Sequence, residues 1–148
     1  MLAQRRSAAL YGELMVETGV ADADPTQLIL MLFDGLLDSL TVADGHLERN
    51  AIAEKSAHLV RAGRIVLGLQ NALDFDKGGE IARNLAELYG YLTRRILHVN
   101  LHNDRVALKE VRGLVEQIRD AWRQVPALAR PALQSRAGFT NLYPISAS

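Results

Sequence analysis

Residues 105–125, RVALKEVRGLVEQIRDAWRQV, decide the fold class of this chain. Apolar side chains recur in this stretch at alternating intervals of three and four residues. That spacing places them on one face of an α-helix that packs against other helices. Pro126 ends the pattern, because proline lacks the backbone N–H that a helix interior needs. The members of this apolar stripe are Leu108, Val111, Val115, Ile118, Trp122 and Val125.

Three stretches upstream of residue 105 show the same helical periodicity. They cover residues 24–47, about 51–73 and about 80–103. Each is long enough for a helix of about 30 Å, at a rise of about 1.5 Å per residue. On the last of these helices we expect an inward stripe made of Ile81, Leu85, Leu88, Leu92, Ile96 and Val99.

Boundary residues separate these stretches. Pro25 suits the first position of a helix and Asp24 suits its N-cap. The pair Gly78-Gly79 predicts a stop and a turn between the second and third helices. Asp104 supplies a new N-cap ahead of the fourth helix.

The sequence therefore predicts an all-α protein with one domain over residues 1–148. Its centre, residues 24–125, is expected to form an antiparallel up-and-down four-helix bundle with short links. Residues 1–20 are amphipathic enough for a short helical cap. Residues 126–148 contain three prolines and are expected to form an irregular tail.

Composition excludes several functional classes. The chain carries 17 basic and 17 acidic side chains, so it lacks the basic excess of a general nucleic-acid binder. No run of 18 apolar residues is present, and the N-terminus does not have the pattern of a signal peptide. We therefore expect a cytoplasmic protein that binds no nucleic acid and does not insert stably into a membrane.

The sequence offers weak candidates for catalytic chemistry. No histidine follows a glutamate by three residues, as the di-iron bundles require. His98 and His102 share a helix face with Asp104 nearby, but a pair of polar residues near a helix C-terminus explains them more simply. Asp34 and Asp38 fit a solvated face better than an acid–base pair. We predict no enzymatic activity, no cofactor and no metal.

Apolar width and internal glycines exceed what a plain bundle needs. About half of the apolar residues beside the stripes are expected in the core, and the rest on an exposed surface for a partner's helix. The internal glycines indicate either close helix approach or shallow surface channels, and the sequence leaves both interpretations open. The apolar residues are Ile29, Phe33, Val60, Tyr89, Tyr91 and Leu97, and the glycines are Gly35, Gly63, Gly68, Gly90 and Gly113.

Several blocks of the chain, in order and spacing over about residues 11–125, resemble the FliS family of flagellar export chaperones. The resemblance implies a bundle that binds the disordered C-terminal region of flagellin, prevents premature polymerisation and delivers flagellin to the flagellar type III export gate. Tyr11 matches the aromatic residue of a family segment that covers the apolar groove when cargo is absent. The blocks are VET (16–18), ADPTQLILMLFDG (23–35), GGEIARNLAELYGYL (78–92), Asn100, ND (103–104) and residues 110–122.

The predicted partners are thus the flagellin C-terminal region and, for the loaded chaperone, an export-gate component. A weak homodimer is a further prediction, and the alternative function is a self-associating bundle with a structural or adaptor role. The predicted partner-binding residues are Tyr11, Leu14, Met31, Phe33, Asp34, Ile65, Asn84, Leu88, Tyr89, Tyr91, Leu92 and Asn100.

Two departures from the family pattern stand out. Gly90 replaces a residue that is commonly acidic in the family, and the tail after Pro126 is longer than usual. Apolar residues of that tail, including Phe139 and Tyr143, are hypothesised to dock into the groove of the bundle. Truncation at about residue 130 should then strengthen cargo binding.

Overall fold

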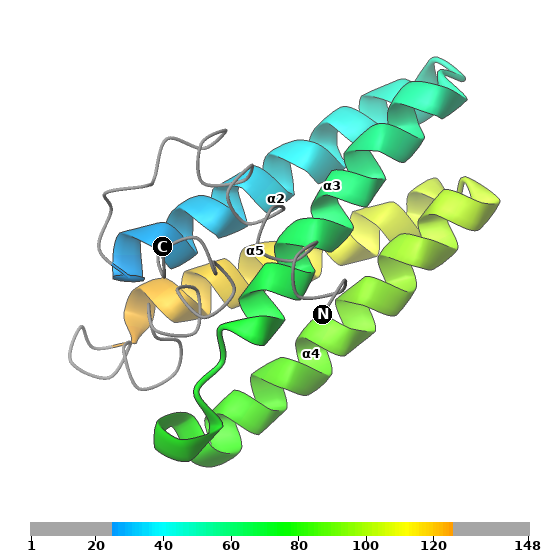
Figure 1. The fold of residues 1–148 in the computed structure, drawn as a ribbon. Helices are drawn as coiled ribbons and strands as arrows, with labels where there is room; N and C mark the ends of the chain where they lie inside the picture. Colours follow the sequence, from blue (N-terminus) through cyan, green and yellow to red (C-terminus); the bar gives the residue numbers. More distant parts are fainter. Residues whose placement is uncertain (1–24, 126–148) are drawn as a thin grey trace, which may run out of the picture.

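The computed structural model describes residues 25–125, which are built on four helices packed against one another. These are α2 (Pro25–Glu48), α3 (Ile52–Asn71), α4 (Phe75–His102) and α5 (Arg105–Gln124). Figure 1 shows that consecutive helices run in opposite directions and are joined by short links. Both α3 and α5 pack on α2 and on α4, which closes a ring of four. The prediction of an all-α chain with four packed helices is confirmed.

The expected cap and tail, residues 1–20 and 126–148, lie outside the described residues. The same holds for Asp24, the expected N-cap of α2. No helix within residues 25–125 is long and apolar enough to cross a membrane.

One continuous hydrophobic core fills the centre of the ring. On α5 the predicted stripe from Leu108 to Trp122 is buried, because its three–four spacing keeps one face inward. Phe33 and Tyr89 meet in the core with ring centroids 6.5 Å apart. Burial raises the pKa of the Tyr89 hydroxyl, since the phenolate would lose its hydration there.

The stripe expected on the third helix is wrong at two positions. Ile81 and Leu88 are exposed, and their neighbours Ala82 and Tyr89 are buried instead. Residues 82, 89, 92, 96 and 99 follow the steps of three, four and seven that bring side chains back to a shared seam. Hydrophobicity alone favoured Ile81 over Ala82, whereas the packing geometry selects the smaller residue.

The helix boundaries follow their capping residues. Asp74 accepts a hydrogen bond from the backbone N–H of Lys77 at 2.9 Å, so α4 begins at Phe75. The third helix was expected to begin at about residue 80, after a turn at Gly78-Gly79, and this is wrong in part because one helical turn of α4 precedes the break. The break itself is at Gly79, whose φ of 55° and ψ of −128° are accessible to glycine.

The link between α4 and α5 has the predicted form. Asn103 adopts the left-handed conformation, with φ 54° and ψ 37°. Asp104 then accepts a hydrogen bond from the backbone N–H of Ala107 at 3.0 Å, which satisfies one of the free donors at the start of α5. The carboxylate also contacts His98, and these two hydrogen bonds hold the pKa of Asp104 below its usual value.

Candidate partner-binding groove

An open groove of about 540 Å³ lies between α3 and α4. Val60, Gly63 and Leu67 supply its α3 side at intervals of three and four residues, which places them on one helix face. Val60 is 47% exposed and Leu67 is 45% exposed. Because they share one helix face, these two side chains give a partner's helix an apolar surface to pack against. The lining of this α3–α4 groove is Val60, Gly63, Arg64, Leu67, Gln70, Gly90, Thr93 and Arg94.

Two glycines keep the groove open. A Cβ atom added at Gly63 would meet nothing within 4 Å, and one added at Gly90 would meet only the Arg94 guanidinium, at 3.4 Å. Close helix approach does not require glycine at either position, because no atom of a packed helix fills the space. For these two residues, the structure favours surface channels over tight packing.

Charge around the α3–α4 groove is positive. Arg64 and Arg94 belong to its lining, which contains no carboxylate. The exposed Leu97 follows Thr93 by one helical turn on α4 and extends the apolar surface beyond the lining. The groove thus offers an apolar floor with basic side chains, which suits an amphipathic helix with acidic flanks.

A buried polar cluster joins α3 to α4 further along the same seam. The Lys55 ammonium donates to the backbone carbonyl and to the side-chain Oδ1 of Asn100, both at 2.9 Å. The Ser56 hydroxyl also donates to Asn100 Oδ1, at 3.0 Å. Because a buried ammonium needs several acceptors, this cluster holds the two helices at one register.

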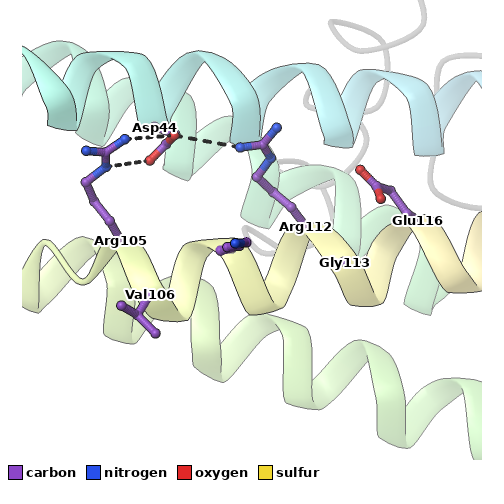
Figure 2. Close-up of a pocket in the computed structure, with 7 residues that line it drawn as sticks. Asp44, Arg105, Val106, Arg112, Gly113 and Glu116 are labelled. Atoms are coloured by element: carbon purple, nitrogen blue, oxygen red, sulfur yellow. Dashed lines mark hydrogen bonds and ion pairs between the residues drawn. The ribbon is translucent and has the colours of Figure 1, made fainter.

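A second open groove, of about 490 Å³, lies between α2 and α5 (Figure 2). Asp44 of α2 accepts from Arg105 Nε at 2.8 Å and lies 3.7 Å from Arg112 Nη1. These guanidinium groups, Arg105 first, hold the pKa of Asp44 below its usual range. The lining of this α2–α5 groove is Asp44, Arg105, Val106, Lys109, Arg112, Gly113 and Glu116.

The predicted partner-binding residues do not gather on one face. Asp34 pairs with Arg119 at 3.1 Å, and the Tyr91 hydroxyl donates to Glu110 on α5. Tyr11 and Leu14 lie outside the described residues. Whether any of the set contacts a partner stays a prediction. Met31, Asp34, Asn84 and Leu88 are exposed, Tyr91 and Asn100 are half-buried, and Phe33, Ile65, Tyr89 and Leu92 are buried.

The predicted partner-binding residues include none of the lining of the α3–α4 groove. From the sequence, Val60 belongs to the apolar residues beside the stripes, and Gly63 and Gly90 belong to the internal helical glycines. The apolar residue and the two glycines line one groove only because α3 and α4 lie side by side. The spacing Val60-Gly63-Leu67, with a glycine between two apolar residues on one helix face, is the sequence pattern that indicates this groove.

The histidine pair does not form a metal site with the acid beside it. His98 and His102 have ring centroids 4.7 Å apart, and His98 Nε2 lies 3.1 Å from Asp104 Oδ2. Over residues 25–125, no group of three or more potential ligands is arranged to hold a metal ion. Asp104 is also already engaged as the N-cap of α5.

An all-helical bundle with an open apolar groove has the arrangement of a protein that binds the helices of a partner. The family model for flagellar protein FliS matches residues 7–129. The flagellar secretion chaperone FliS of Salmonella typhimurium is 47% identical over 116 residues, which cover 78% of this chain and 86% of the relative. FliS of Escherichia coli is 39% identical over 124 residues, 83% of this chain and 90% of the relative. Pseudomonas aeruginosa FliSB is 39% identical over 112 residues, with 76% and 89% covered.

The chain therefore belongs to the FliS family of flagellar secretion chaperones. The family is non-enzymatic, so the prediction that this protein is not an enzyme is confirmed. A secretion chaperone also implies a cargo partner.

Proposed function

We propose that this protein is a cytoplasmic export chaperone that binds the disordered C-terminal region of flagellin. Binding prevents premature polymerisation, and the loaded chaperone passes its cargo to the flagellar type III export gate. Family membership supports a secretion role. The open α3–α4 groove is the observation that carries the proposal, because it offers a cargo helix an apolar surface that the bundle leaves exposed.

The cargo helix lies along the α3–α4 groove in this proposal. Its apolar side chains cover Val60 and Leu67, and its backbone approaches the bundle most closely at Gly63. Acidic side chains at its edges pair with Arg94. A disordered segment must offset its ordering entropy by burying apolar surface, and the exposed walls of the groove provide such surface.

The flanking segments regulate access to the groove in the same proposal. The N-terminal segment around Tyr11 and Leu14 covers it when cargo is absent. The tail after Pro126 competes for it, so truncation at about residue 130 strengthens cargo binding. Unchanged affinity after truncation would remove the tail from the proposal but leave the groove untouched.

A matched pair of glycine substitutions tests the groove. Gly63→Leu fills the α3–α4 groove and Gly113→Leu fills the α2–α5 groove, and at both positions a new Cβ meets nothing within 4 Å. Calorimetry with a peptide of the flagellin C-terminal region should show one-to-one binding that Gly63→Leu weakens about tenfold or more, the effect of losing about 1.4 kcal/mol. Gly113→Leu should leave the affinity within about twofold.

Two results would count against the proposal. If Gly63→Leu and Gly113→Leu lowered the affinity for the flagellin peptide equally, the cargo would bind elsewhere or the substitutions would disturb the whole bundle. A wild-type protein that forms a stable dimer by light scattering and ignores the flagellin peptide would instead support the alternative, a self-associating bundle that pairs through its exposed apolar residues.

A further inference from the structure

The α2–α5 groove lies across the bundle from the α3–α4 groove. Because α3 packs between α2 and α4, and α5 closes the ring, these two seams face opposite sides. A cargo helix at the first seam leaves the second uncovered by that helix. The lining of the second groove is also different, because five of its seven residues are charged, against two of eight in the first.

We propose that the α2–α5 groove is a second docking site, which binds an acidic segment of another protein while cargo occupies the opposite face. Arg105, Lys109 and Arg112 follow one another at intervals of four and three residues, so they form a basic edge along α5. Figure 2 shows Arg105 and Arg112 reaching from α5 toward α2 on either side of Asp44.

Asp44 does not consume the donors of this edge. It accepts from Arg105 at 2.8 and 3.2 Å, and Arg112 approaches it only at 3.7 Å. Glu48 also lies 3.9 Å from Arg105 Nη2. Each guanidinium has five N–H donors, so both arginines keep donors for carboxylates of a ligand. Within the described part of the chain, Lys109 has no ion-pair partner.

Carboxylates already lie at both ends of the groove. Glu116 lies one turn beyond Arg112 on α5 and extends toward α2 (Figure 2). Asp44 and Glu48 face Arg105 at the other end, at 2.8 and 3.9 Å. A carboxylate of the bound segment therefore meets the least repulsion at Lys109.

The shape of the groove permits close approach of a peptide. Gly113 has nothing within 4 Å of the position that a Cβ would occupy. Val106 is 82% exposed and, in Figure 2, points away from α2 at the rim of the groove. An apolar side chain of the bound segment can cover Val106 while its acidic residues pair with the basic edge.

A synthetic helical peptide with three glutamates, spaced four and three residues apart, serves as the probe. Its binding to the ¹⁵N-labelled full-length chain is followed by NMR at low salt. Amide signals of residues 105–116 and of Asp44 should shift, and those of Gly63 and Gly90 should not. Replacing the glutamates with glutamines should weaken binding about tenfold, since several exposed ion pairs are lost together.

Matched variants separate the groove from general charge. Lys109→Glu and Lys77→Glu change the net charge equally, but Lys77 lies on α4 and outside the groove. We expect Lys109→Glu and Gly113→Leu each to weaken binding of the glutamate peptide several-fold. Lys77→Glu and Gly63→Leu should leave it within about twofold.

Several outcomes would overturn this proposal. Equal binding of the glutamine peptide would remove the role of charge, and equal loss with Lys77→Glu would show unspecific attraction. Tighter binding of a single-stranded oligonucleotide of equal charge would point to a general polyanion site. Failure of the flagellin experiment leaves each of these results unaffected, because the probe contains no flagellin sequence.

Discussion

Lys55 is only 2% exposed although its side chain carries an ammonium. Burial of an unpaired charge would be costly, so its two hydrogen bonds to Asn100 are needed to keep it there. Such a cluster adds little net stability compared with apolar packing, but it penalises any other register of α3 against α4. Asn100 was predicted as a partner-binding residue. In the structure its oxygen atoms accept hydrogen bonds from Lys55 and Ser56 of α3.

The polar cluster can be tested by removing one partner at a time. Asn100→Ala removes the side-chain oxygen that accepts from Lys55 and Ser56 and leaves the Lys55 ammonium with the backbone carbonyl alone, so the free energy of unfolding should fall by about 1–3 kcal/mol. Lys55→Met removes the charge at similar volume and should change it by less than about 1.5 kcal/mol. Urea unfolding measures both, and the double variant should be more stable than Asn100→Ala alone. A double variant less stable than either would contradict this explanation.

Asp44 makes the stability of the bundle sensitive to acid. Its pKa lies below the ordinary value of 3.8 in the folded state, because the Arg105 and Arg112 guanidinium groups favour the carboxylate. The contribution of Asp44 to the free energy of unfolding is fully present at pH values above the ordinary pKa. It is lost as the pH falls through the lower pKa of the folded state. We expect the free energy of unfolding of the wild type to decline more steeply below about pH 4 than that of Asp44→Asn.

Thermal unfolding between about pH 2 and pH 6 measures this difference. Asp104 also has a lowered pKa, so Asp44→Asn should reduce the acid dependence without abolishing it. Parallel curves for the two proteins over the whole range would show that Asp44 contributes nothing.

Helix ends are the features of this chain that local sequence predicts most directly. Asp104 caps α5 as expected from the Asn103-Asp104 pair, because capping depends on contacts within three residues. Asp104→Ala should lower the free energy of unfolding by about 1 kcal/mol, in a calorimetric or denaturant measurement. Asp76→Ala, in the first turn of α4 but not at its N-cap, is the matched control and should have a smaller effect.

Gly79 controls how α4 begins. Its positive φ of 55° separates the single turn after Asp74 from the long helix that lines the α3–α4 groove. Gly79→Ala forces a β-carbon into that conformation and should destabilise the protein by about 1 kcal/mol or more. Gly63→Ala should stabilise it by up to about 1 kcal/mol, because Gly63 lies in a regular helix with free space beside it. Chemical denaturation of both variants checks the opposite signs.

Which face of α4 is buried could not be predicted from the sequence as precisely as the helix ends. Ile81 and Ala82 are adjacent, and rotation by one residue turns a helix by about 100°. The inward face is chosen by contacts with α3 and α5, which local hydrophobicity does not describe. The same uncertainty explains why buried Tyr89 was expected beside the stripe rather than within it.

At the scale of the whole molecule, the bundle presents two grooves of different chemistry on opposite sides. Each has a helical glycine at which a Cβ would meet nothing, Gly63 in one and Gly113 in the other. In the proposals made above, a cargo helix occupies the α3–α4 groove and an acidic segment occupies the α2–α5 groove, so the two partners bind to separate faces.

Salt should distinguish the two grooves. Raising the salt from about 0.05 M to about 0.5 M shortens the screening length, so binding of the glutamate peptide should weaken several-fold. Binding of the flagellin peptide rests mainly on apolar burial and should change much less, with a negative heat-capacity change. Calorimetry at two salt concentrations and two temperatures measures both quantities. An equally steep salt dependence for the two peptides would contradict the assignment of the grooves.

The sequence by itself determined the helices, most of their ends and the family, because periodicity, capping and local motifs depend on residues within one or two turns of each other. The stretch 105–125 alone predicts a helix with one buried face, and α5 (Arg105–Gln124) has that form. Only the tertiary structure decided which apolar residues remain exposed and which glycines form a groove. Val60 and Gly90 are far apart in the chain and line one surface because the packing of α3 on α4 brings them together. That arrangement depends on the fit of whole helix faces, which no short segment specifies.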